Sequence, residues 1–103
     1  MIVSQVINTT LASYLRLDSP DNTELAFLTE ILSITKSYMS SYTGLPITSV
    51  DANDTTLDSY EDLSIAELII AQDMYDNRSL EVKSESQNKI VTTILDMHSV
   101  NLL

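Results

Sequence analysis

The sequence predicts an all-α protein, a small bundle of four main helices with a long acidic loop between the second helix and the third. Three observations support this prediction. Of the 103 residues, 44% are hydrophobic, the chain has one glycine and two prolines, and apolar residues recur at helical spacing. Turn-rich β architectures need more glycine and proline than this. A chain of this length can form one core without disulfides, so we expect residues 1–103 to be a single domain.

The first helix is expected over residues 6–17, with Ser4 or Asn8 as the capping residue at its start. Apolar residues recur there every three or four positions, which is the spacing of one helix face. They are Val6, Ile7, Leu11, Tyr14, Leu15 and Leu17.

The second helix is expected over residues 23–43 and has the clearest pattern. Ser19 followed by Pro20, or Asn22, can cap its start, because a side-chain oxygen there accepts from a free N–H group of the first turn. One half of this helix is apolar, with Thr35 among the apolar residues. The apolar residues are Leu25, Phe27, Leu28, Ile31, Leu32, Ile34, Tyr38, Met39 and Tyr42.

A helix stop follows at Gly44, the single glycine of the chain. We expect Gly44 to adopt the left-handed conformation just after the last helical residue, where a Cβ would clash. Leu45 then folds back as the hydrophobic contact of a Schellman-type stop, and Pro46 prevents the helix from continuing.

A long polar connection over residues 45–63 leads to the third helix, which we expect from Ser64 to about residue 77. Ser64 and Glu67 have the spacing of a capping box, and the apolar residues that follow lie nearly all round the helix. Such a helix is usually central and covered on several sides. Residues 79–86 are expected to form a loop, and Ser84 with Gln87 can cap the fourth helix that follows. Its predicted buried face consists of Ile90, Val91, Ile94, Leu95, Met97 and His98.

The residues that carry catalysis or bind metals are scarce. The chain has one histidine, no cysteine and no glycine-rich phosphate loop, so nucleophilic triads and zinc sites lack their components. We therefore expect no enzymatic activity, no cofactor and no metal. His98 has no evident catalytic partner and is expected to cap or pack at the end of the fourth helix. The N-terminus resembles no signal peptide, and no apolar run is long enough to span a membrane.

Charge is the strongest global feature. Fifteen acidic residues against five basic ones give a formal net charge of −10, and no lysine or arginine occurs between Lys36 and Arg78. Such a surface repels phosphate backbones, which argues against ordinary recognition of DNA or RNA. The alternative interpretation of the acidic residues is solubility alone.

The polar half of the second helix contains mostly small neutral side chains, whereas exposed helix faces are usually rich in Glu and Lys. Small side chains allow another backbone to approach closely, so this face is a predicted subunit interface, and an ordinary serine-rich surface is the alternative. The predicted interface residues are Ser33, Ser37, Ser40 and Ser41.

Several stretches together resemble the small head-tail connector (adaptor) proteins of tailed bacteriophages and prophages, over nearly the whole chain. They are YLRLD (14–18), SPDN (19–22), SYTGLP (41–46), DMYDNR (73–78) and ILDMHSVNLL (94–103). The Asp- and Thr-rich insert at 50–62 departs from the family pattern. The resemblance implies a helical virion structural protein without enzymatic activity, active in virion assembly and DNA packaging. It also implies a dodecamer-like ring beneath the portal protein, joined to the next connector or tail-completion protein and located at the head-tail interface of the virion.

The resemblance assigns roles to two further groups of residues. Double-stranded DNA would pass through the ring without sequence-specific binding, and Asp54, Asp58 and Glu61 are the candidate acids of the channel or its rim. Residues Val100, Leu102 and Leu103 are candidates for docking on the portal, or they close the base of the bundle. Before incorporation into the virion the protein is expected in the host cytoplasm. The alternative function is an acidic inhibitor or DNA mimic that binds a basic nucleic-acid enzyme.

Overall fold

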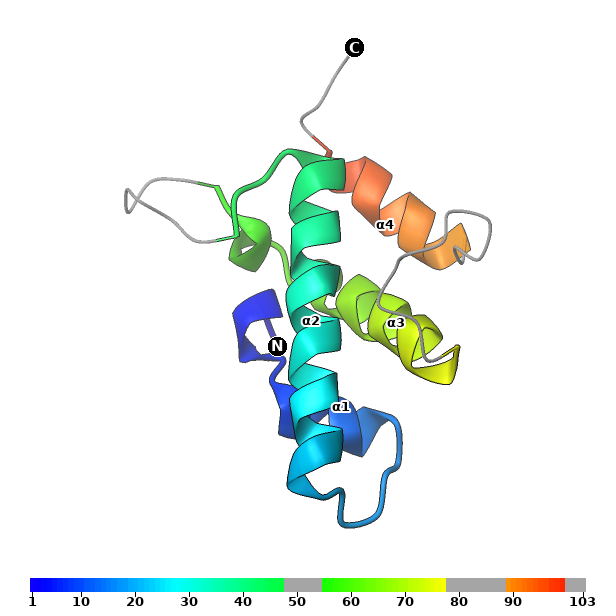
Figure 1. Cartoon of the computed structure of the whole chain (residues 1–103). Helices are drawn as coiled ribbons and strands as arrows, with labels where there is room; N and C mark the ends of the chain where they lie inside the picture. Colours follow the sequence, from blue (N-terminus) through cyan, green and yellow to red (C-terminus); the bar gives the residue numbers. More distant parts are fainter. Residues whose placement is uncertain (48–54, 78–88, 100–103) are drawn as a thin grey trace.

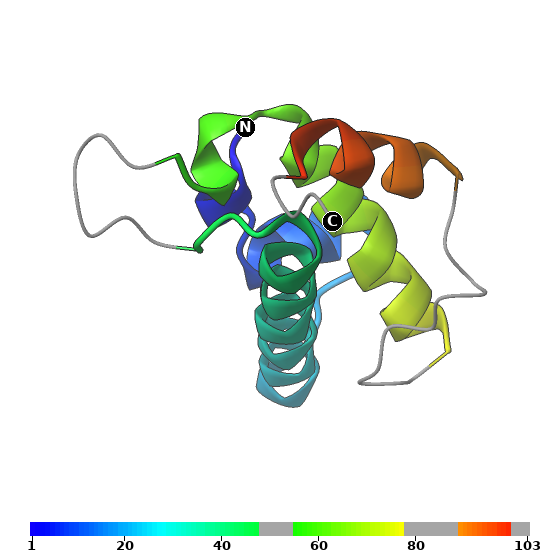
Figure 2. The same cartoon turned by 90° about the horizontal axis from the view of Figure 1, so that it is seen from above.

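The computed structural model describes residues 1–47, 55–77 and 89–99. The elements, in order, are η1 (Val3–Gln5), α1 (Asn8–Tyr14), α2 (Asn22–Thr43), η2 (Leu57–Ser59), α3 (Asp62–Asp76) and α4 (Lys89–His98). The predicted all-α bundle of four main helices is confirmed. The long helix α2 stands in the middle, with η1 and η2 on one side and α3 and α4 on the other (Figure 1). Seen from above, η1 and η2 again lie to one side and α3 and α4 to the other, while α2 lies at one edge of the fold (Figure 2).

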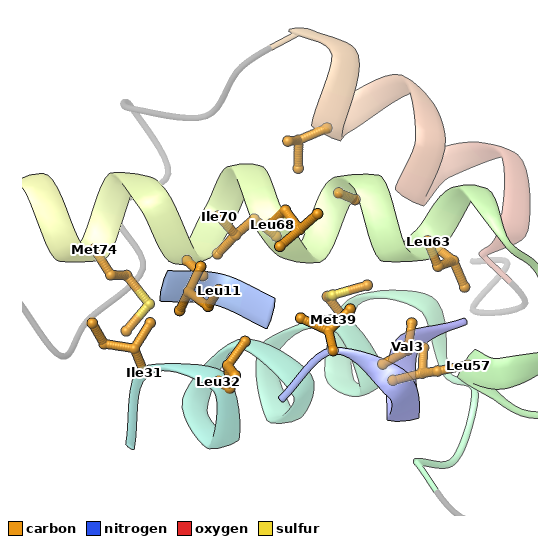
Figure 3. Close-up of a cluster of buried hydrophobic side chains, with 14 of the residues drawn as sticks. Val3, Leu11, Ile31, Leu32, Met39, Leu57, Leu63, Leu68, Ile70 and Met74 are labelled. Atoms are coloured by element: carbon orange, nitrogen blue, oxygen red, sulfur yellow. The ribbon is translucent and has the colours of Figure 1, made fainter. Parts of the chain in front are cut away.

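The core lies between α2 and α3, and every element contributes to it (Figure 3). Met39 of α2 and Met74 of α3 are both buried in this contact. Two short elements complete it, because Val3 of η1 and Leu57 of η2 are also fully buried. The connection that the sequence predicts to be a polar loop therefore contains an anchored turn. The Leu57 N–H donates to the Pro46 carbonyl oxygen at 3.1 Å, which joins the two described ends of that connection.

The first helix is shorter than predicted. Val6 and Ile7 lie outside it in extended conformation, and no side chain caps it, so neither Ser4 nor Asn8 has the predicted role. At its other end Arg16 adopts a left-handed conformation, with φ of 60°, and the Leu17 N–H reaches the Ala12 carbonyl at 3.0 Å. Helix α1 is thus ended by the backbone turn at Arg16, where periodicity alone would extend it to Leu17.

Helix α2 begins one residue before the predicted start and uses a different cap. The Asp21 carboxylate accepts from the Glu24 N–H at 2.8 Å, and Asp21 has the extended backbone of a capping residue. The predicted caps are wrong. Ser19 has φ of 48° in the turn before the helix, and Asn22 is already the first helical residue.

The stop at Gly44 is confirmed, with φ of 79° and ψ of 3°. The Gly44 N–H donates to the Ser40 carbonyl at 2.9 Å, which is the single bond of the simpler left-handed stop. The Leu45 N–H donates to the Thr43 hydroxyl at 3.2 Å, so the second bond of a Schellman motif is replaced by a side chain. The Leu45 side chain folds back as predicted and is only 3% exposed.

Two predictions for helices α3 and α4 are wrong. Helix α3 starts at Asp62, and Ser64 lies inside its first turn, where its hydroxyl donates to the Glu61 carbonyl at 2.7 Å. The predicted capping box is therefore absent. In α4 the buried side chains are Val91 and Leu95, whereas Ile90 and Met97, which were also predicted to be buried, are exposed. The predicted caps Ser84 and Gln87 lie outside the described residues.

Candidate subunit interface

A groove of about 460 Å³ lies along α2 on the side of η1 and α1. Its volume is within the range of about 300–1,000 Å³ that pockets for small organic groups have, so it can accommodate several side chains. The lining comes from three segments of the chain. These residues are Val6, Ile7 and Asn8, then Thr29, Leu32, Ser33, Lys36 and Ser37 of α2, and finally Ile47.

Local structure explains why apolar side chains are exposed in this groove. Val6 is buried and anchors the segment between η1 and α1, so the next residue of the extended chain, Ile7, is 54% exposed. Ile47 follows the stop of α2 and is 38% exposed. The start of α1 is held on α2 by the Asn8 side-chain amide, which donates to the Thr29 hydroxyl at 3.2 Å. The groove therefore has a fixed wall and two exposed isoleucines.

The predicted serine face is divided by the structure. Ser33 and Ser37 are exposed and line the groove. Ser40 does not, because its hydroxyl donates to the Leu45 carbonyl at 2.7 Å and supports the stop of α2. Ser41 is exposed but also lies outside the lining. The two serines nearer the middle of α2 are thus the better interface candidates.

The groove is free of acidic residues although the chain contains fifteen. Lys36 is its one charged lining residue, and among the described residues Lys36 forms no ion pair. Contact between two copies of a chain with a net charge of −10 is least opposed by repulsion where acids are absent. The groove therefore combines exposed apolar area with a favourable charge.

A buried carboxyl group lies on the side of α3 that faces the core. Glu67 is fully buried, and both of its carboxyl oxygens lack a hydrogen-bond partner. Burial raises the pKa of Glu67 to about 8, an effect that Lys36 opposes and Asp58 reinforces through their charges. The sequence interpretation missed this residue because it assigned Glu67 to a capping box. The apolar residues all round α3 were the available signal that position 67 is covered.

Two of the three predicted channel acids, Asp58 and Glu61, lie within the described residues. Asp58 is half-buried, and its carboxylate accepts from the Ser4 N–H at 2.8 Å, which ties η2 to η1. Glu61 has a side chain that is 80% exposed, and it lies 3.6 Å from the N-terminal ammonium. Asp54 lies outside the described residues. Asp58 thus ties η2 to η1, and of the two described acids Glu61 is the more exposed to solvent.

The fourth helix ends in a cluster around His98, for which the sequence showed no partner. The His98 Nε2 atom lies 2.8 Å and 2.9 Å from the two oxygens of Asp62, and its ring stacks on Tyr60 with 4.0 Å between ring centres. On α2, the Tyr42 hydroxyl donates to Asp96 at 2.6 Å, and this bond raises the pKa of Tyr42 to about 12. These contacts fix the end of α4 against α3 and α2.

The remaining site predictions concern the chain end and metals. Val100, Leu102 and Leu103 lie outside the described residues, so their docking role stays a prediction. Within the described ranges, no group of three His, Cys, Asp or Glu side chains could hold a metal ion. In the same ranges no helix has the length and apolar character needed to cross a membrane.

Comparison with protein-family models, with curated proteins and with solved structures finds no match for this chain.

Proposed function

We propose that this chain is a structural subunit of a ring-shaped head-tail connector of a tailed bacteriophage or prophage. The observation that carries the proposal is the acid-free groove along α2, where Ser33 and Ser37 lie beside the exposed Ile7 and Ile47. Apolar side chains exposed together at a groove are typical of surfaces that bind another protein. A ring of identical subunits needs such a surface on every copy.

The charge of the chain fits the passage of DNA through such a ring. Fifteen acids against five bases give each copy a strongly negative surface, which repels a phosphate backbone and lets DNA move without sticking. Described acids that are exposed to solvent occur on several elements. They are Asp18, Asp21, Glu30, Glu61, Asp76 and Asp96. Residues Val100, Leu102 and Leu103 are the proposed portal contact, next to the anchored end of α4.

The portal protein encoded in the same genome provides the test. Wild-type chain and portal are mixed, and the size of the complex is measured by sedimentation and negative-stain electron microscopy. We expect a ring on the portal. The variant Ser33→Glu with Ser37→Glu should remain folded but form no ring, because it places unpaired charges in the contact. The control, Ser13→Glu with Thr23→Glu, adds the same charge at exposed positions outside the groove and should form rings normally.

The exposed acids also favour a second candidate function, an acidic inhibitor or DNA mimic. Such a protein would bind a basic nucleic-acid enzyme as a monomer or dimer and would not bind the portal. Its affinity for the enzyme would fall as added salt screens its charges. The variant Ser33→Glu with Ser37→Glu separates the two functions. A DNA mimic that carries these two added charges should bind its enzyme at least as well as the wild type does. Failure of the wild-type chain to associate with the portal would contradict the connector function.

A further inference from the structure

We propose that Glu67 of α3 is a pH-sensitive switch, and that loss of its proton opens the layer formed by η1 and η2 while α2 and α3 stay in contact. The layer consists of residues 3–6 and 57–59. In the closed form the layer is packed as the structure describes it, and in the open form it has moved away from α2 and α3. This switch is independent of the connector function, because it follows from the surroundings of one buried carboxyl group.

Glu67 is buried without a partner. Its side chain is fully buried, and both carboxyl oxygens lack a hydrogen-bond partner among the described residues. A neutral carboxylic acid tolerates such a place better than a carboxylate does, because an unpaired charge loses its hydration there and gains no compensating contact. The closed form therefore favours the protonated acid, in agreement with the raised pKa of Glu67, about 8.

Two charged groups act on Glu67 from the elements that pack around it. Lys36 of α2 lowers the pKa of Glu67, and Asp58 of η2 raises it. Lys36 makes no hydrogen bond with the Glu67 carboxyl group, so it does not replace the lost hydration of a carboxylate. The short turn η1 has no titratable side chain.

The titratable groups on α1 and α4, which also pack on α3, have other partners or lie in solvent. They are Tyr14, which bonds Gln72, Asp96, which bonds Tyr42, His98, which bonds Asp62, and the exposed Lys89. The proton on Glu67 is therefore the means by which the closed form avoids an unpaired buried charge.

The layer is joined to the part of the core that contains Glu67. Leu63 lies one turn before Glu67 on the same face of α3, and it belongs to one core cluster with Val3 of η1 and Leu57 of η2 (Figure 3). The turn η1 packs on both α3 and η2. A hydrogen bond of 2.8 Å from the Ser4 N–H to the Asp58 carboxylate joins the two turns, so they can move as a unit.

The layer is also the part of this core that is easiest to open. Each of its two turns is three residues long, whereas α2 has 22 residues and α3 has 15. Short 3-10 turns at the edge of a fold have low local stability, and long packed helices open last. Moving the layer would admit water to a Glu67 carboxylate at a lower cost in free energy than separating α2 from α3.

The direction of the pH effect follows from the two forms. Once water reaches Glu67 in the open form, its pKa returns to about 4.5, the ordinary value. Between about 4.5 and about 8 the closed form holds a proton that the open form has lost. The equilibrium constant for opening should therefore rise about 10-fold per pH unit in this range and be constant above it. Val6 of the layer lines the groove along α2, so opening also removes part of the groove wall.

Introduced thiols can report the opening, because the chain has no cysteine. Val6→Cys and Val3→Cys each place one thiol in the layer, and Ala71→Cys places one inside α3 as the control. All three positions are buried. Each variant is made with Glu67 and with Glu67→Gln, and its fold is checked by circular dichroism. The rate of modification by a thiol reagent is measured from pH 5 to pH 9 and divided by the rate of a short cysteine peptide, which removes the effect of thiol ionisation.

With Glu67 present, the corrected rate at positions 3 and 6 should rise about 10-fold per pH unit from about pH 5 to about pH 8 and then level off. With Glu67→Gln the corrected rate should not change with pH. At pH 8 the rate at position 71 should be at least about 10-fold lower than at position 6, because α2 and α3 remain packed.

Substitutions of the two neighbouring charges test the surroundings of Glu67. Asp58→Asn removes a negative charge but keeps an oxygen for the Ser4 N–H, so the rise should end at a lower pH. Lys36→Met removes a positive charge, so the rise should end at a higher pH. Glu30→Gln, which neutralises an exposed acid of α2, is the control and should leave the end of the rise unchanged.

Three results would overturn the switch. The same pH dependence with Glu67→Gln would show that another group controls the layer. A thiol at position 71 that reacts as fast as one at position 6 at pH 8 would show that the whole chain unfolds instead of the layer. An end of the rise that moves with neither Asp58→Asn nor Lys36→Met would show that these charges do not act on the group that titrates.

Discussion

His98 at the end of α4 holds Asp62 at the start of α3 through a single ring nitrogen, with 2.8 Å and 2.9 Å to the two carboxylate oxygens. The pair joins residues 36 positions apart in the sequence. Both side chains are partly shielded, and Tyr60 covers the imidazole by stacking. The contact fixes the α4 helix against the rest of the bundle.

We expect His98→Ala to destabilise the protein by about 1–2 kcal/mol, because it removes the hydrogen bonds to Asp62 and the stacking on Tyr60. The free energy of unfolding is measured by urea denaturation. Hydrogen exchange of α4 should become faster at the same time. Thr93→Ala, an exposed change on the same helix, is the control and should be neutral or slightly stabilising, without faster exchange in α4. Unchanged exchange in α4 of the His98 variant would show that the pair does not hold this helix.

Asp58 and Glu61 are three positions apart, but replacing each with alanine should change the stability of the protein by different amounts. Asp58→Ala should destabilise by about 1–2 kcal/mol, because the Ser4 N–H loses the carboxylate that binds η1 to η2. Glu61→Ala should change stability by less than about 0.5 kcal/mol, since its ion pair is exposed. Thermal denaturation of the two variants compares them directly. Equal stability of both variants would contradict the structural role of Asp58.

Glu67 should make stability depend on pH. Its pKa is raised from 4.5 to about 8 by burial, so between these values the folded chain holds a proton that the unfolded chain has lost. The free energy of unfolding should therefore fall as pH rises from about 4.5 to about 8, by at most about 1.4 kcal/mol per pH unit from this group. Above that range its contribution should be constant.

Glu67→Gln isolates this contribution, because glutamine has the same shape and does not titrate. Urea denaturation of both proteins at pH 5 and pH 8 should show a larger advantage of the variant at pH 8. An advantage that is the same at the two pH values would mean that Glu67 does not retain its proton in the fold.

Gly44→Ala should destabilise by about 1 kcal/mol, because alanine at φ of 79° places its Cβ against the backbone. A thermal melt measures the change. Ser37→Ala, in the interior of the same helix, is the control and should be neutral or slightly stabilising, since alanine favours helices. A variant at Gly44 as stable as wild type would reject the strain argument.

The sequence predicted the long helix and its stop well, because both depend on local chemistry. The apolar residues of α2 and the conformational freedom of Gly44 are visible in the sequence itself. The start of the helix was predicted one residue late, since Ser19, Asp21 and Asn22 are all acceptable caps and the preceding turn decides among them.

The candidate interface was only partly predictable. The serine face pointed to Ser33 and Ser37, but the groove also needs Ile7 and Ile47, which tertiary packing brings beside α2. Periodicity likewise placed Ile90 and Met97 in the core, because an apolar residue on a helix looks the same in the sequence whether the fold buries it or exposes it. Glu67 was assigned to a helix cap because its spacing from Ser64 fits that motif.

Native mass spectrometry of the purified wild-type chain over a range of concentrations decides whether the chain assembles into a ring. We expect a closed homo-oligomer of one defined size that grows no further, and we expect the variant Ser33→Glu with Ser37→Glu to lose it. A wild-type chain that remains a monomer or dimer at every concentration, and that binds a basic nucleic-acid enzyme instead of the portal, would rule out the connector function.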